Sequence, residues 1–139
     1  MFTRKSGKTK TVPMPVTIST ALSKGALVAW SSGRLIAATT TTAGSAIAGV
    51  LVKAIASTDS DYATTRDVLV EVPVEKDVLW EADVTATLVV ADVGLYCDLT
   101  SSLVINRGAS TYDIVQCRKL ISTTKGLFVL NIGTDAIAK

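Results

Sequence analysis

The sequence predicts an all-β fold, a small antiparallel β-barrel or sandwich with an extended N-terminal arm. Two central segments alternate apolar and polar residues with the period of two that is typical of half-buried strands. Short apolar runs recur along the chain, and Gly, Ser, Thr and Asn separate them at intervals typical of a sandwich or barrel. No stretch has the periodicity of an amphipathic helix of three turns. At 139 residues the chain has the length of one ordinary domain.

Residues 1–20 differ in composition from the rest, and we interpret them as an extended basic arm that precedes a β-barrel domain over residues 21–139. A terminal segment of this kind is expected to be disordered unless something holds it. Pro13 and Pro15 keep the end of the arm extended and exclude it from the centre of a sheet. The first ten residues carry four basic side chains and no acidic one: Arg4, Lys5, Lys8 and Lys10.

The first strands of the domain are predicted on both sides of a short turn. Ala26–Trp30 and Arg34–Ala38 are apolar runs, and Ser31–Gly33 between them is typical of a tight hairpin connection. A threonine-rich loop follows. Ile47–Ile55 is the next strand, with Gly49 expected at a bulge or at a point of close packing.

The central region has the clearest strand pattern. Every second residue from Val68 to Val74 is valine, and a second alternating strand runs from Asp77 to Thr85. Acidic residues occupy the opposite face of both strands, so we expect this face to be exposed. Pro73 places the first of these strands at a sheet edge or a bulge.

The C-terminal half continues the pattern of short strands. The pattern of residues 87–93 is ambiguous and is compatible with one or two turns of helix. Phe128, Leu130 and Ile132 are expected to share one face of the last strand. In this half we expect strands over Leu95–Leu99, Leu103–Ile105, Tyr112–Ile121 and Leu127–Ile132.

Charge is unevenly distributed, although the net charge is only +2. Residues 59–92 contain nine acidic residues against Arg66 and Lys76, and we call these acids the acidic belt. The belt and the basic arm suit head-to-tail association of copies, the arm alone suits an acidic partner, or the belt is a solvated surface. The belt consists of Asp59, Asp61, Asp67, Glu71, Glu75, Asp77, Glu81, Asp83 and Asp92.

The composition is apolar and poor in charge. Hydrophobic residues make up 48% and charged residues 19%, which suits either a protein packed against neighbours or a tightly wrapped monomer. The longest uncharged stretch, Leu35–Val52, is interrupted by Thr, Ser and Gly, so we interpret it as two strands and a loop and expect no membrane segment. Cys97 and Cys117 lack metal-ligand spacing, so they are predicted to be buried free thiols, with a cross-strand disulfide as the alternative.

The groups that common enzyme chemistry needs are missing from the sequence. The chain has no histidine, the usual general base and metal ligand. It has no phosphate-binding glycine motif and no nucleophile elbow. Carboxylates such as Glu71 and Glu81 alternate on outward faces, which is typical of a solvated surface rather than a glycosidase pair. We therefore expect no enzymatic activity, no cofactor and no metal.

A single-strand nucleic-acid-binding barrel with a basic tail is an alternative interpretation. Such barrels combine phosphate-binding cations with exposed aromatic residues on which bases stack. Aromatic residues make up only 5% of this chain, and most fall at apolar strand positions. Direct contact with nucleic acid is therefore not favoured, and the same composition argues against a carbohydrate-binding or adhesive module.

Two stretches of the chain carry a family resemblance. One is GALVAWSSGRLIAAT (residues 25–39) with the following strand IAGVLVKAI (residues 47–55), and the other is VGLYCDLTSSLVINRGASTYDIVQCRKL (residues 93–120). Together they resemble the head decoration or cement proteins of tailed bacteriophages and related phage structural barrels. The likeness covers most of residues 20–132 and consists of a rhythm of short strands and glycines.

The resemblance implies a virion structural protein that decorates and stabilises an icosahedral capsid by binding its outer surface at capsomer junctions. It implies the major capsid protein as partner, a homo-oligomer with a trimer favoured, and a place on the capsid exterior after assembly in the host cytoplasm. A role in head–tail joining or in the tail stays open. The residues that we expect to contact the partner are Arg4, Lys5, Lys8, Lys10, Val16 and Ile18.

Overall fold

A computed structural model describes residues 1–131 and contains strands and two short 3₁₀ helices, η1 (Gly44–Ala46) and η2 (Val90–Asp92). The predicted all-β class is confirmed. The strands are β1 (Thr3–Ser6), β2 (Thr9–Val16), β3 (Leu27–Ser31), β4 (Arg34–Ala37), β5 (Ile47–Leu51), β6 (Arg66–Pro73), β7 (Leu79–Thr85), β8 (Tyr96–Ser101), β9 (Val104–Asn106), β10 (Val115–Leu120) and β11 (Lys125–Leu130).

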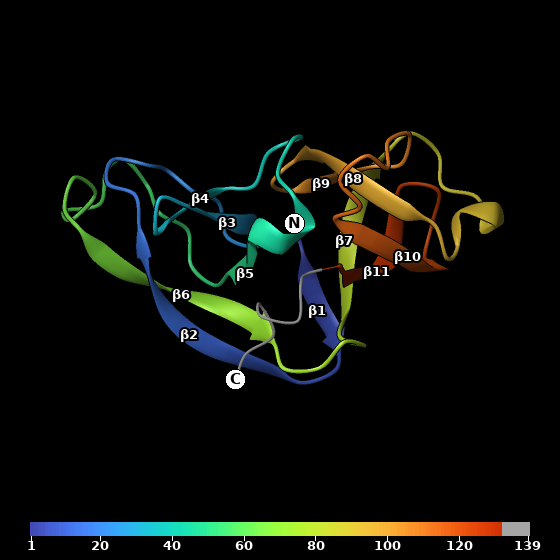
Figure 1. Cartoon of the computed structure of the whole chain (residues 1–139), viewed down its shortest axis with the longest axis horizontal. Coiled ribbons are helices and arrows are strands. Elements are labelled where there is room, and N and C mark those ends of the chain that lie inside the picture. Colours follow the sequence, from blue (N-terminus) through green and yellow to red (C-terminus); the bar gives the residue numbers. More distant parts are fainter. Residues whose placement is uncertain (132–139) are drawn as a thin grey trace.

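The strands form two small barrels that lie side by side (Figure 1). The first barrel closes in the order β2-β4-β3-β5-β6. The second follows the order β7-β11-β10-β8-β9, and a parallel pairing of β7 with β9 joins its ends. The sequence predicted one barrel over residues 21–139, whereas residues 74–78 between β6 and β7 carry the chain from one barrel to the other.

The predicted hairpin and the predicted role of Gly49 are both confirmed. Ser32 and Gly33 have φ of 51° and 78°, so they make a two-residue turn with the twist that β3 and β4 require. The β3–β5 register shifts between Val28 and Ala29, opposite Gly49. A Cβ on Gly49 would lie 2.5 Å from the carbonyl oxygen of Glu71, so the backbones of β5 and β6 approach too closely for a side chain.

The alternation in the central region serves two different cores. Val70 and Val72 on β6 are buried in the first barrel, whereas Trp80 and Ala82 on β7 are buried in the second. Glu71 lies between the two valines and is partly exposed. The period of two therefore predicted the local strands correctly, although it carried no information on which barrel each strand enters.

The two barrels share one apolar cluster where they meet, and a second cluster fills the inside of the first barrel. β5 and residues 27–29 of β3 are buried on both faces: Val28 and Leu51 pack inside the first barrel, whereas Leu27 and Ile47 belong to the cluster that fills the second barrel around Trp80. Each large apolar side chain removed from water stabilises the fold by about 1.5–3 kcal/mol. The contact between the barrels is therefore part of the core rather than a surface contact.

The N-terminal arm expected over residues 1–20 is not confirmed. β1 pairs with β7, and β2 pairs with β6 along its whole length. Phe2 is only 2% exposed and belongs to the core cluster of the second barrel. The N–H of Val74 donates to the carbonyl of Lys8 at 3.1 Å, so the two segments that join the barrels run side by side.

Pro13 and Pro15 lie on an edge of β2 that no strand within residues 1–131 covers at these two positions. The Val74–Lys8 hydrogen bond and the unbroken register show that even-numbered residues of β2 bond to β6. Odd-numbered residues, the two prolines among them, direct their backbone nitrogen to the other edge. On that edge β4 pairs with β2 only at Val16, so the prolines interrupt no ladder.

Other elements differ from the expectation in their extent. β5 ends at Leu51 rather than at Ile55, which instead forms an isolated bridge with Leu22. Residues 87–93 contain η2, and Ile132 of the expected last strand lies outside the described residues. Among residues 1–131, no helix combines the length and the hydropathy that crossing a membrane requires.

Candidate functional site

The basic residues of the N-terminus contact the acidic belt of the same molecule. Arg4 Nε lies 2.7 Å from Glu71 Oε1, and Lys5 Nζ lies 3.3 Å from Glu81 Oε2. The backbone N–H of Lys8 donates to Glu75 Oε1 at 3.0 Å. Exposed ion pairs of this kind contribute about 0–1 kcal/mol each to the free energy of folding. Their main effect is therefore to align β1 with its neighbours.

The other residues predicted to bind a partner lie on or after β2. Lys10 pairs with Val72 in the β2–β6 ladder. Val16 is 2% exposed and packs in the core of the first barrel, whereas Ile18 is 48% exposed. The six predicted residues therefore do not all lie on the surface, and their contact with a partner stays a prediction.

Asp92 belongs to the acidic belt by sequence, but the structure buries it. It is 5% exposed, and its Oδ2 accepts hydrogen bonds from Arg107 Nε and from the N–H of Val89, both at 2.8 Å. The hydrogen bond from Arg107, assisted by that from Val89, holds the pKa of Asp92 below its ordinary value although burial opposes this. This pair fixes η2 to the loop after β9.

Asp98 is a second buried carboxylate that sequence reasoning did not single out. It is 3% exposed and accepts three backbone hydrogen bonds, from Thr111, Tyr112 and Asp113, at 2.8–2.9 Å. Cys97 and Leu99 on either side of it are also buried, so this part of β8 is buried on both faces. Its partners satisfy the carboxylate and shape the loop before β10, which is a structural role.

The two cysteines are buried free thiols, as predicted. Burial raises the pKa of Cys97 to about 11, with smaller contributions from neighbouring negative groups. Burial also raises the pKa of Cys117. A thiol in this state is a poor nucleophile near neutral pH because almost none of it is thiolate.

Exposed apolar residues concentrate around η2, and we call Val89, Val90, Val93, Leu95 and Tyr96 the η2 surface. Each of these side chains is at least 41% exposed, and Val90 is 80% exposed. Figure 1 shows η2 as the short gold coil at the far end of the second barrel, away from the first barrel. Asp92 is the one charged residue within this segment, and it is buried.

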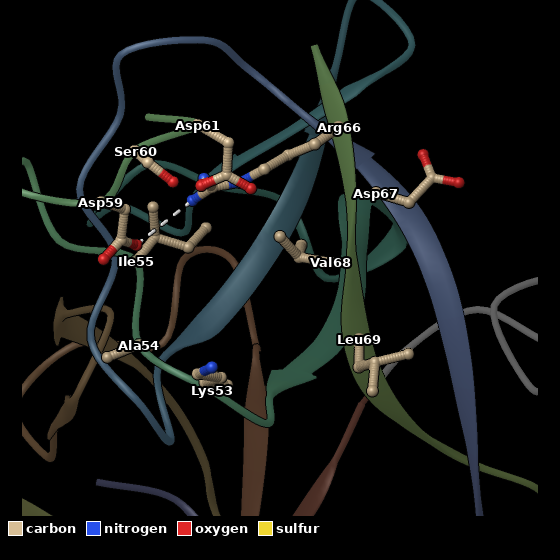
Figure 2. A pocket seen from close by; sticks show the side chains of 10 residues that line it. All are labelled: Lys53, Ala54, Ile55, Asp59, Ser60, Asp61, Arg66, Asp67, Val68 and Leu69. Carbon is tan, nitrogen blue, oxygen red and sulfur yellow. Dashed lines mark hydrogen bonds and ion pairs between the residues drawn. The ribbon is translucent and has the colours of Figure 1, made fainter. Parts of the chain in front are cut away.

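A groove of about 410 Å³ opens at the other end of the molecule, on the first barrel. Residues 53–55 form one wall, and residues 66–69 of β6 form the other. Figure 2 shows Arg66 reaching across the groove from β6 to the loop that carries Asp59 and Asp61. Arg66 forms ion pairs with both carboxylates, 3.5 Å from Asp59 Oδ2, and these hold the loop in place.

Sequence reasoning found neither the η2 surface nor the groove, because in both places an apolar run has the pattern of a buried strand. Val89 and Val90 continue an apolar run that a core strand would also show, so the pattern gives no sign that they are exposed. The groove depends on the point where β5 leaves β6, and the strand-like run over residues 47–55 continues past that point.

Within residues 1–131, no group of three or more His, Cys, Asp or Glu side chains is arranged to hold a metal ion. No protein-family model matches the sequence, and no curated protein matches it.

Proposed function

We propose that this chain is a virion structural protein that decorates an icosahedral capsid, binding its outer surface at capsomer junctions without catalysing a reaction. The proposed partner is the major capsid protein. The stretches that resemble phage decoration proteins form β3, β4 and β5 of the first barrel and β8, β9 and β10 of the second. The resemblance therefore involves both barrels.

The η2 surface is the observation that carries the proposal. Contiguous apolar patches on soluble proteins commonly mark sites of protein association. Here the patch is uncharged and lies at one end of two barrels that share a core. The Asp92–Arg107 pair anchors η2 from below, so the patch is presented by an ordered segment.

Binding through such a surface suits an assembly of many copies. Covering one exposed valine or leucine contributes up to about 1.5–3 kcal/mol, and ordering the interface offsets much of this. A single contact is then weak. Copies clustered on a shell gain by about 10²–10⁴ over a single site through effective concentration.

The test is co-sedimentation of the purified chain with capsid shells that lack it. We expect the chain to sediment with the shells at a fixed stoichiometry. Val90→Asp places a charge on the η2 surface and should reduce binding at least tenfold, whereas Thr41→Asp, on an exposed loop of the first barrel, should not. Failure of the unmodified chain to sediment would contradict the proposed function.

The variants also separate two possible contact surfaces. If Val90→Asp binds as well as the unmodified chain, the η2 surface is not the site. Lys8→Glu tests the predicted contribution of the basic N-terminus. Loss of binding in this variant alone would place the contact on β1 and β2 and not on η2.

The nucleic-acid-binding alternative has less support, because Arg4 and Lys5 are paired with Glu71 and Glu81. It predicts affinity for an oligonucleotide that falls steeply with salt. The fluorescence of Trp30, which is 39% exposed, gives a direct readout of such a titration.

A further inference from the structure

One wall of the groove in Figure 2 is the segment of β6 from Arg66 to Leu69, and no strand within residues 1–131 pairs with its edge on the side of β5 over residues 66–68. Odd-numbered residues of β6 direct their backbone groups toward β5, because the even-numbered ones bond to β2. β5 pairs with β6 at Glu71 and Val70, and the N–H of Val52 donates to the carbonyl of Leu69 at 3.2 Å. Beyond this point, no residue within 1–131 hydrogen-bonds to the N–H of Leu69 or to the backbone groups of Asp67.

The opposite wall is held away from β6 by its own hydrogen bonds. Ile55 exchanges two of them with Leu22, at 2.8 and 3.0 Å, so the backbone of Ile55 is paired with Leu22 and not with β6. The Arg66 ion pairs with Asp59 and Asp61 hold the loop above. The Ile55–Leu22 hydrogen bonds and the Arg66 ion pairs therefore keep the two walls of the groove apart.

We propose that this groove binds an extended peptide segment of another protein, which pairs with Asp67 and Leu69 as an added strand. Backbone hydrogen bonds supply the binding in this mode of recognition, and alternate side chains supply the specificity. The inference goes beyond shell decoration and does not depend on it, because the groove and the η2 surface lie on different barrels.

The side chains along this edge specify the kind of segment. Asp67 and Leu69 point to one side of β6 and Val68 to the other (Figure 2). Asp67 forms no ion pair with any residue in the described range, and Leu69 is 50% exposed. Cross-strand neighbours then favour a basic side chain opposite Asp67, a small apolar one opposite Val68 and an apolar one opposite Leu69.

The groove as a whole has the same charge preference. Its lining contains three carboxylates, Asp59, Asp61 and Asp67, against two cations, Lys53 and Arg66. Arg66 is already paired with the first two carboxylates. A segment with one basic residue complements this lining, and an acidic segment does not.

Two acetylated and amidated peptides, Thr-Thr-Lys-Ala-Val-Thr-Thr and Thr-Thr-Val-Ala-Lys-Thr-Thr, present the pattern in both chain directions. They are titrated into the isotopically labelled full chain and followed by the amide NMR signals. At least one should shift the Asp67 and Leu69 amides, with a Kd on the order of 1 mM. Replacing its Lys by Glu should weaken binding about fivefold or more.

Two variants test the backbone and the charge separately. Leu69→Pro removes one unpaired N–H but no described hydrogen bond, and it should weaken binding of the Lys peptide about fivefold or more. Asp67→Lys should reverse the preference, so that the Glu peptide binds more tightly. Thr11→Pro is the matched control, because it removes an N–H from the edge of β2 that no strand within residues 1–131 covers at this position, and it should leave binding unchanged.

Three results would overturn the proposal. The first is that neither Lys peptide shifts the Asp67 and Leu69 amides at concentrations up to about 10 mM. The second is that the shifts are confined to Thr9 and Thr11 on the edge of β2. The third is that Asp67→Lys keeps the peptide preference of the unmodified chain. The circular dichroism of each variant establishes that it is folded. If Leu69→Pro does not fold, the Asp67→Lys comparison still decides the charge preference.

Discussion

Asp92 shows how a single buried carboxylate supports a proposed binding surface. The hydrogen bond from Arg107 joins η2 to the loop after β9, and that from the N–H of Val89 stabilises the turn of η2 itself. Val90 and Val93 on the same short segment are exposed and make no comparable anchor. Asp92 is therefore one anchor of the η2 surface, beside the backbone hydrogen bond from Gly94 to Cys117.

Asp92→Asn should lower the free energy of unfolding by about 1–2 kcal/mol at pH 7, because Arg107 loses a charged partner. The pKa of Asp92 is lowered in the folded state from an ordinary value near 3.9. Its contribution is thus fully present above about pH 4 and is lost as the pH falls through the lower folded-state pKa. The variant and the unmodified chain should therefore converge in stability below about pH 4.

Urea denaturation at pH 7, 5 and 3 measures this convergence. Asp77→Asn is the matched control, because the side chain of Asp77 is 85% exposed and lies 4.0 Å from Arg118. This control should change stability by less than about 0.5 kcal/mol at each pH. Equal stability of Asp92→Asn and the unmodified chain at pH 7 would show that the Arg107 pair does not anchor η2.

At the scale of elements, two glycines distinguish the cost of backbone strain from that of close approach. Gly33 has φ +78° and no atom within 4 Å of the point where a Cβ would lie, whereas Gly49 has φ +154° and the Glu71 carbonyl 2.5 Å from that point. Gly33→Ala should cost about 1 kcal/mol through its positive φ alone. Gly49→Ala should cost about 2–4 kcal/mol, because β5 and β6 must also separate. Thermal unfolding compares the two, and equal costs would contradict the close approach.

The open edge of β2 gives a prediction about association. Pro13 and Pro15 face an edge that no strand within residues 1–131 covers between Thr9 and Pro15. Unpaired N–H groups on such an edge template pairing with another chain, and proline removes them. Pro13→Ala with Pro15→Ala should therefore increase self-association in sedimentation velocity. Pro73→Ala, in β6, is the control and should stay as monodisperse as the unmodified chain.

The elements themselves followed from local pattern, but their ends and partners did not. The turn at Ser32 and Gly33 and the alternation around Val70 and Trp80 are encoded by neighbouring residues, so the sequence predicted them. β5 ends at Leu51 because Ile55 pairs with Leu22, which lies far away in the chain. No local feature of the apolar run marks that end, and so the groove was not foreseen.

At the scale of the whole molecule, the uneven charge distribution corresponds in part to contacts within one chain. The basic N-terminus and the acidic belt suggested contact between copies, an acidic partner for the arm or a solvated surface, and the structure joins Arg4 to Glu71 and Lys5 to Glu81 within the chain. Phe2, two residues before Arg4, is buried in the core. Pairings between distant segments depend on the closure of the sheet, which composition and periodicity do not describe.

The shared core predicts that the two barrels unfold together. Ile47 belongs to a strand of the first barrel but packs in the cluster of the second, so Ile47→Ala should destabilise both by about 2–4 kcal/mol. In a Trp30→Phe background, the fluorescence of Trp80 reports on the second barrel, and far-UV circular dichroism reports on both. The two signals should give one coincident urea transition.

Val16→Ala, which opens space only inside the first barrel, should move the same single transition. Two separate transitions, with Val16→Ala shifting the dichroism but not the Trp80 signal, would mean that the barrels are independent and merely touch.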